Sequence, residues 1–298
     1  MRNKLISSLA GATLSFAASG LAFAADIAVK APPPAPAPVP TWTGFYAGIQ
    51  FGGGWSDEAV NYSPNDPFAA SLLSGSLVFI GQQPVASGYR VPQSGLVGGF
   101  EAGYNWQAGS NWLLGFEADF SFSGMNGQAS ATSNFATTPF FITQSTNANQ
   151  STDWYGTVRG RAGWIATPNL LLFGTGGFAY GRVDDSASYV INTSAGILAV
   201  APTPVGGFSF TCFPGVPCFT GSSSAIRTGW TAGGGAEWLL DQHWSAKIEY
   251  QFVDLGTETI RVTALSVAFQ PPGTTPTSFN AAFHDRFNVV RVGLNYRF

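Results

Sequence analysis

Ten charged side chains recur inside segments that are otherwise apolar or rich in glycine, and they are the residues best equipped for chemistry. They are Glu101, Glu117, Asp119, Arg159, Arg161, Arg227, Glu237, Lys247, Glu249 and Arg291. Acids and bases in equal number could transfer protons or could neutralise one another as ion pairs. Because a charge in apolar surroundings must be paired or hydrated, we expect a structural network of ion pairs. Arg297 adds one more positive charge in the same kind of segment.

Histidine often serves as a general base, and the chain has two, His243 and His284. Such a base needs a hydrogen-bonded nucleophile and an orienting group, and Ser266, Ser278 or Asp285 could stand near His284. A membrane-embedded hydrolase or acyltransferase is therefore an alternative, although a histidine in a hydrated loop is the simpler interpretation. We expect no catalytic residues, no cofactor and no metal site.

The two cysteines, Cys212 and Cys218, stand in the sequence CFPGVPC. An oxidising compartment favours their pairing, and the intervening Pro214-Gly215 permits a turn that brings the sulfurs together. Two free thiols are the alternative. Zinc is disfavoured because it takes about four ligands and no histidine lies nearby. We expect a disulfide that pins a loop.

The charged residues occupy one face of segments in which every second side chain is apolar. The end of the chain shows this most clearly, where polar residues alternate with Val290, Val292, Leu294, Tyr296 and Phe298. Successive side chains of a strand face opposite sides, so the segment is a ribbon with one apolar and one polar face. Because it runs to a terminal aromatic residue, it is typical of the strand that closes a membrane barrel, and Tyr296 and Phe298 are expected to signal assembly.

Segments of this kind predict eight strands, each long enough to cross an outer membrane. They span 44–55, 94–107, 112–123, 153–166, 170–182, 225–240, 244–255 and 286–298. The register of 170–182 stays open, because both of its faces are apolar or glycine. Short turns (108–111, 167–169 and 241–243) alternate with long loops (56–93, 124–152, 183–224 and 256–285). The pattern predicts an all-β fold, an eight-stranded antiparallel up-and-down transmembrane β-barrel with short periplasmic turns, long extracellular loops and both termini in the periplasm.

A soluble antiparallel sandwich would show similar strands, and the charges decide between the two architectures. In a sandwich the polar faces point to water, and nothing requires their signs to balance. In an eight-stranded barrel they face a lumen just wide enough for side chains, where near-neutrality is needed. Charged residues make up only 10% of the chain, against about 25% in typical proteins, which also favours the membrane. A net charge of -3 disfavours nucleic acid as a partner.

The N-terminus predicts export. Arg2 and Lys4 precede an apolar run, and Ala22-Phe23-Ala24 has the small-x-small pattern of a signal-peptidase site. We therefore expect residues 1–24 to be a signal peptide, and an uncleaved membrane helix is the alternative. Residues 25–42 form a proline-rich periplasmic segment, a semi-rigid tether or simply a hydrated tail. Residues 43–298 form the barrel domain.

Three segments resemble a known family. WTGFYAGIQFGGGW (42–55), WSAKIEYQFVDLG (244–256) and NVVRVGLNYRF (288–298) look like the first, seventh and eighth strands of the alphaproteobacterial outer-membrane immunogenic proteins. These RopB-like small barrels are distantly similar to the transmembrane domain of OmpA. The resemblance implies an abundant, surface-exposed eight-stranded barrel, often grouped with porins, and it does not imply catalysis.

These features leave three classes of function. We expect a surface protein with a structural or interaction role, anchored in outer-membrane lipid and inserted by the barrel-assembly machinery through its last strand. A small porin-like channel for small solutes is the alternative, although buried charges leave little room for water. The enzyme is the third. The uncharged loop 124–152 could recognise an extracellular partner or could merely cover the barrel mouth.

Overall fold

The computed structural model describes residues 41–74, 87–137, 140–193, 198–199, 211–212, 215–265 and 277–298. The predicted signal peptide and the proline-rich segment as far as Pro40 lie outside these residues. Among the residues described, no helix is long and apolar enough to cross a bilayer.

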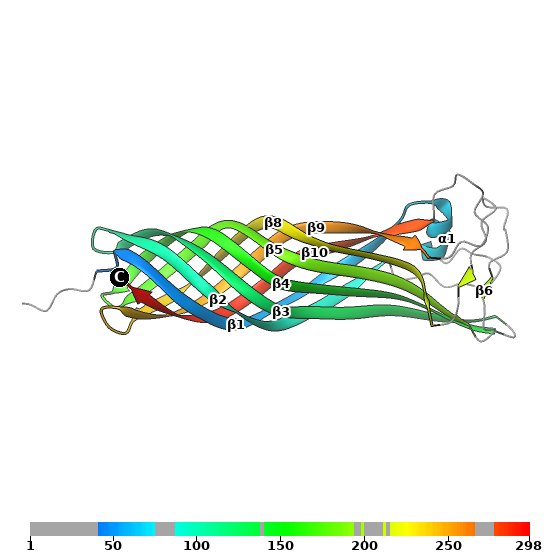
Figure 1. Cartoon of the computed structure of the whole chain (residues 1–298), viewed down its shortest axis with the longest axis horizontal. Coiled ribbons are helices and arrows are strands. Elements are labelled where there is room, and N and C mark those ends of the chain that lie inside the picture. The colour runs from blue at the N-terminus through cyan, green and yellow to red at the C-terminus, as the bar shows by residue number, and fades with distance from the viewer. Residues whose placement is uncertain are drawn as a thin grey trace, which may run out of the picture. The chain divides into compact units, whose positions relative to one another are not determined.

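Eight antiparallel strands close into a barrel, which confirms the predicted fold class (Figure 1). In chain order they are β1 (Gly44–Pro64), β2 (Gly88–Ala108), β3 (Trp112–Thr137), β4 (Phe140–Thr167), β5 (Leu170–Thr193), β8 (Pro217–Leu239), β9 (Trp244–Ala264) and β10 (Ser278–Arg297). Each strand pairs with the next around the ring, and β10 pairs with β1 to close it. A separate two-stranded ladder joins β6 (Leu198–Ala199) to β7 (Thr211–Cys212).

The short turns and the long connections lie at opposite ends of the barrel. The turns β2–β3, β4–β5 and β8–β9 come at the same end as the C-terminus, as the sequence predicts (Figure 1). At the other end, α1 (Pro67–Ser74) follows β1. The carboxylate of Asp66 caps this helix by accepting from the Ala69 amide at 2.8 Å, and it also accepts from the Ser278 amide at 2.9 Å. We call the turn end basal and the other end distal.

The strands are longer than the sequence predicts. Residues 124–137 and 140–152, expected to be a loop, continue the β3–β4 hairpin in unbroken register from Met125↔Thr152 to Thr137↔Phe140. Likewise β1 runs on to Pro64 and β9 to Ala264. The expectation was wrong because the outward side chains of 126–134 and 143–151 are polar, as are many inward ones, so no apolar alternation marks a strand. The hydrogen-bonded ladder persists without it.

A band of exposed apolar side chains surrounds the basal part of the barrel. Its members include Phe45, Phe51, Leu96, Phe100, Trp106, Trp112, Phe116, Phe122, Trp164, Phe178, Trp230, Trp238, Ile248, Val292 and Phe298, all more than 40% exposed. The band coincides with the segments predicted to cross the membrane. The open register of 170–182 is settled here, because Leu171 and Phe173 point inward while Leu172 and Phe178 point outward. Such a surface suits acyl chains rather than water.

The interior of the barrel is divided into apolar layers, and β5 contributes residues to each of them. Along β5, Phe173 belongs to an apolar basal layer, Ala179 and Val183 to a middle layer, and Tyr189 to a distal layer. Polar side chains separate these layers. The basal layer comprises Trp42, Leu113, Ile165, Leu171, Phe173 and Leu239. The middle layer comprises Val97, Met125, Tyr155, Ala179, Val183, Val253, Leu255, Phe287 and Val289.

Candidate functional site

Glycines make room for the charged residues inside the barrel. Across the strand ladder, Gly52 is paired with Arg291, Gly235 with Glu249 and Gly177 with Arg159. The same pairing joins Gly48 to Glu101, Gly103 to Glu117, Gly115 to Arg161 and Gly293 to Lys247. A small barrel has little space between its walls, so a long inward side chain fits best where the neighbouring position carries none.

The structure brings nine of the ten predicted charged residues together between the basal and middle layers. This central network consists of Glu101, Glu117, Asp119, Arg159, Arg161, Glu237, Lys247, Glu249 and Arg291. Their side chains are at most 1% exposed. Five acids face four bases, and neutral donors bind the acids as well: Tyr46 OH donates to Glu117 Oε2 at 2.6 Å and Ser245 Oγ donates to Glu237 Oε1 at 2.5 Å.

Two arginines bridge the carboxylates. Arg159 forms ion pairs with Glu117 and Glu249 and lies 3.0 Å from Asp119 Oδ2. Arg291 lies 2.9 Å from Glu249 Oε2 and 3.3 Å from Asp119 Oδ1. Arginine suits this position because its planar guanidinium presents several donors at once. Each guanidinium therefore joins strands from different parts of the wall.

Lys247 and Arg161 complete the central network. The Lys247 ammonium lies 2.5 Å from Glu101 Oε2, 3.2 Å from Glu117 Oε2 and 3.3 Å from Glu249 Oε2. Arg161 pairs with Glu237, and its guanidinium lies 4.0 Å from the centre of the Phe173 ring in the basal layer. The ionic and apolar layers are thus in direct contact.

Three carboxylates of this network are close enough to ligate a metal. Oxygens of Glu101, Glu117 and Glu249 all lie within 4.8 Å of one another. However, the Lys247 ammonium already contacts all three. A lysine cation between the carboxylates supplies the positive charge that an ion would bring, so we interpret this donor set as a structural ion cluster.

The tenth residue, Arg227, lies elsewhere. It belongs to a distal cluster, between the middle and distal layers, that we define as Asp185, Arg227, Glu258 and Asp285. Arg227 pairs with Glu258, and its Nε lies 3.6 Å from Asp285 Oδ2. The sequence predicted correctly that Arg227 points inward but wrongly that it joins the other nine charged residues. Its position along the barrel axis depends on the register between strands. Three acids here face one base.

The excess of acid in the distal cluster affects its protonation. Both aspartates lie beyond the lipid-facing band. Burial and the neighbouring carboxylate of Asp285 raise the pKa of Asp185 to about 8. Burial raises the pKa of Asp285 to about 6, opposed by Arg227 and by the Gln150 amide, which donates to its Oδ1 at 2.6 Å. Asp185 therefore holds a proton at neutral pH.

Among the residues described, neither histidine forms the alternative catalytic group of a histidine with a nucleophile and an orienting residue. His284 Nδ1 shares a hydrogen bond with Thr257 Oγ1 at 2.9 Å, whereas Asp285 is held by Gln150 and Arg227. Ser278 Oγ accepts from the Asn65 amide at 3.2 Å, and Ser266 lies outside the described residues. His243 is exposed in the β8–β9 turn, where its ring stacks on Tyr296.

The remaining predicted residues lie at the two ends of the barrel. Cys218 begins the inner face of β8 and is disulfide-bonded. The backbone of Cys212 is in β7, but its side chain lies outside the described residues, so its pairing with Cys218 stays a prediction. At the basal end, Phe298 is 79% exposed, packs against Tyr296 and donates its amide hydrogen to Phe45 O at 3.0 Å.

Sequence reasoning missed the neutral members of the site. The sequence assigned Tyr46 to neither face of its strand, yet its hydroxyl is buried against Glu117. Thr157 donates to Asp119, and Asn295 donates to Glu237 at 3.4 Å. Tyr46 lies between Phe45 and Ala47, whose side chains face outward, so alternation along 44–55 could have predicted that Tyr46 points inward. The partner of each donor, in contrast, depends on which strands face each other across the lumen.

The comparisons with known proteins agree with this geometry. A model of the outer membrane protein beta-barrel domain matches residues 15–298. The chain belongs to this outer-membrane β-barrel family. The 31 kDa outer-membrane immunogenic protein of Brucella melitensis is 32% identical over 304 residues, with 100% of both chains covered, and that of Brucella suis matches equally. The resemblance drawn from the sequence is confirmed, and the outer-membrane barrel protein described here is integral to that membrane.

Solved barrels are also similar to this outer-membrane protein. OprG from Pseudomonas aeruginosa is 10% identical with a TM-score of 0.38, covering 86% of this chain and 96% of its own. Ail of Yersinia pestis, in complex with the heparin analogue sucrose octasulfate, is 12% identical with a TM-score of 0.32, covering 86% and 99%.

Proposed function

We propose that this outer-membrane protein is a surface protein whose barrel is a sealed anchor and whose prolonged strands present a rigid structure outside the cell. In this proposal residues 1–24 direct export, residues 25–42 stay in the periplasm, and both termini are periplasmic. The barrel contacts outer-membrane lipid and carries out no reaction. Its extracellular strands meet a partner.

The filled lumen is the observation that carries the proposal. The central network is enclosed by the basal layer on one side and by the middle layer on the other. Beyond these, the distal layer buries Tyr189, Phe219, Phe279 and Phe283, each at most 1% exposed. Apolar side chains packed across a narrow lumen exclude water, and ions do not pass an unhydrated path. This disfavours the porin-like channel.

The charged interior also disfavours catalysis. Each acid of the central network is held by a cation or a neutral donor, and all five acid side chains are at most 1% exposed. The central network instead supports a structural role, because its nine members come from six of the eight strands (β2, β3, β4, β8, β9 and β10) and bind one another by side-chain contacts across the lumen.

The orientation and the assembly route are inferred from the two ends. Outer-membrane barrels keep short turns on the periplasmic side and long segments outside. The exposed C-terminal aromatics Tyr296 and Phe298 lie at the short-turn end. They suit recognition by the barrel-assembly machinery from the periplasm, and they suit an interfacial position after insertion.

Conductance of the folded protein tests the proposal. Protein purified in detergent is first checked for a folded band that changes gel mobility on heating. The folded fraction is then added to a planar bilayer, with a general porin as positive control. We expect no stable openings above baseline, because the apolar layers exclude water. Stable nanosiemens-scale openings would contradict the sealed anchor and support the channel.

A further inference from the structure

Just beyond the lipid-facing band, four adjacent strands carry an outward face of amides and hydroxyls. In the ladder, Asn126 of β3 lies beside Ser151 of β4, then Asp184 of β5 and Ser224 of β8. The next outward row is Gln128, Asn149, Ser186 and Ser222, and the one after it is Ser130, Asn147, Ser188 and Thr220. We call these twelve residues the polar face. Neighbouring strands bring such side chains about 5 Å apart.

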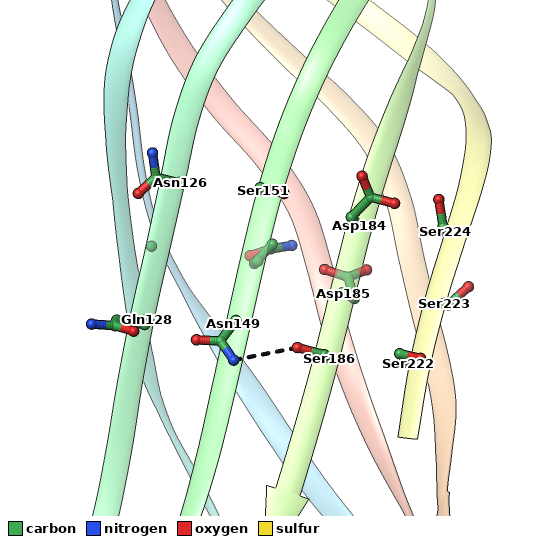
Figure 2. Close-up of a pocket in the computed structure, with 12 residues that line it drawn as sticks. Asn126, Gln128, Asn149, Ser151, Asp184, Asp185, Ser186, Ser222, Ser223 and Ser224 are labelled. Atoms are coloured by element: carbon green, nitrogen blue, oxygen red, sulfur yellow. Dashed lines mark hydrogen bonds between the residues drawn. The ribbon is translucent and has the colours of Figure 1, made fainter. Parts of the chain in front are cut away.

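The polar face is hollowed at its first two rows. A cavity of about 520 Å³ is lined by those rows and by the backbone positions between them, from 126–128, 149–151, 184–186 and 222–224 (Figure 2). Figure 2 shows the amides and hydroxyls side by side on the four strands. The volume falls within the range of small-molecule sites, roughly 300–1,000 Å³.

The lining is polar but almost without charge. Asp184 is the one charged residue of the polar face, and Arg182 Nε lies 3.8 Å from its carboxylate. Asp185 turns inward and is buried. A polyanion would gain no ion pair beyond that single arginine and would meet the carboxylates, whereas a divalent cation would meet a pair of carboxylates, Asp184 and Asp153, that already share the positive charge of Arg182. Charge complementarity therefore favours a neutral ligand.

The hydrogen-bonding capacity of the polar face fits a ligand with many hydroxyl groups. The Asn149 amide donates to Ser186 Oγ at 3.3 Å, and the Asn147 amide donates to Ser188 Oγ at 3.4 Å. Each amide group offers two donor hydrogens and an acceptor oxygen, so most of this capacity faces solvent. Rows of alternating donors and acceptors can bind hydroxyls that both donate and accept.

The polar face is also long. Outward polar residues continue along the hairpin to Asn134 on β3 and Thr143 on β4. At about 3.3 Å per residue, the distance from Asn126 to Asn134 is roughly 26 Å. This exceeds the height of a lipid headgroup above the lipid-facing band and suits an extended polymer lying along the strands.

We propose that the polar face binds a free, neutral polysaccharide chain, with the cavity between β3, β4, β5 and β8 as its principal subsite. The inference deepens the proposed function, because it names the chemistry of the partner and requires the polar face to lie outside the cell.

Binding to defined oligosaccharides tests it. The full chain is purified and folded in a detergent without a sugar headgroup, and its affinity is measured by calorimetry for maltohexaose, cellohexaose and chitohexaose, with a heparin hexasaccharide as the polyanion. Asn149→Lys places a bulky charge at the centre of the polar face. Thr259→Lys does the same at an exposed outward position of β9 and is the matched control.

We expect at least one neutral hexasaccharide to bind, Asn149→Lys to weaken it tenfold or more, and Thr259→Lys to change it less than twofold. Both variants must keep the heat-modifiable band. Binding of heparin alone, equal loss in both variants, or no binding of any neutral probe would overturn the inference. Binding of a fluorescent oligosaccharide to whole cells separates the two proposals. If the purified protein binds the oligosaccharide but intact cells do not, presentation at the cell surface is contradicted, whereas the binding site on the polar face is still supported.

Discussion

Arg159 illustrates how single residues hold the interior together. Its guanidinium contacts three carboxylates from β3 and β9, and none of these side chains touches water. The desolvation cost of each charge is offset only while the others are present. The effect of replacing Arg159 on stability therefore depends on the buried carboxylates that lose their partner.

Arg159→Ala is expected to destabilise the barrel by about 3–5 kcal/mol, because it leaves Glu117, Asp119 and Glu249 with too little positive charge. Unfolding in urea, followed by tryptophan fluorescence in detergent micelles, measures this. The control is Arg90→Ala, which removes the Arg90–Asp57 pair, whose side chains are 69% and 59% exposed. Such a pair contributes less than about 1 kcal/mol. Equal losses in the two variants would contradict a buried network.

Asp185 is expected to make stability depend on pH. Its pKa in the folded protein, about 8, lies above the ordinary value of 3.8, so between these values the folded state holds a proton that the unfolded chain has released. The contribution of Asp185 to stability is then fully present below about pH 4 and is lost as the pH rises toward 8, by up to about 1.4 kcal/mol per pKa unit. Asp285, with a pKa of about 6, acts in the same direction.

The Asp185→Asn variant, which cannot ionise, should therefore lose most of the decline between pH 6 and pH 9. The measurement is the temperature at which the folded gel band disappears at each pH. Asp57→Asn, at an exposed carboxylate, should keep the wild-type profile. A parallel decline in Asp185→Asn would show that other groups cause the pH dependence.

At the scale of elements, the close approach of strands matters as much as their charge. The ladder places Gly52 of β1 beside Arg291 of β10, and a Cβ atom at Gly52 would lie 2.0 Å from the carbonyl oxygen of Val290. Backbone cannot retreat from such a contact without moving the strand. The pairing of glycines with charged residues is thus a condition for closing the barrel around its central network.

Gly52→Ala is expected to destabilise the barrel by about 1–3 kcal/mol through overpacking at the β1–β10 seam. Gly124→Ala is the matched control, because the nearest atom to its new Cβ would lie 3.7 Å away. Urea midpoints of the two variants provide the comparison. If Gly52→Ala matched the control, the strands would have room that the structure does not show.

The elements also show where sequence reasoning ends. Where one face meets lipid, as in 244–255, apolar alternation predicted both the strand and its inward residues correctly. Beyond the lipid-facing band, the residues of 126–134 are polar on the outward face and small or polar on the inward one. Their strand character comes from pairing with β4, which a one-dimensional pattern does not record.

At the scale of the whole molecule, closure of the ring converts separate ribbons into a sealed interior. Residues distant in sequence, such as Glu101 and Lys247, meet only because the lumen is narrow enough for their side chains to cross it. The same closure stacks the apolar layers that disfavour a channel. Because the interior is sealed, function at this scale follows from the outer surface of the barrel, which has an apolar band in the membrane and the polar face beyond it.

The sequence by itself determined the number of membrane strands, the side that meets lipid in every strand except 170–182, and the charges that point inward, because alternation and desolvation act on every residue locally. Only the tertiary structure decided which charges pair, that Arg227 joins Asp285 rather than the central network, and that the predicted loops continue as strands. Those outcomes depend on the register between strands and on the spacing across the lumen, and both arise only when the barrel closes.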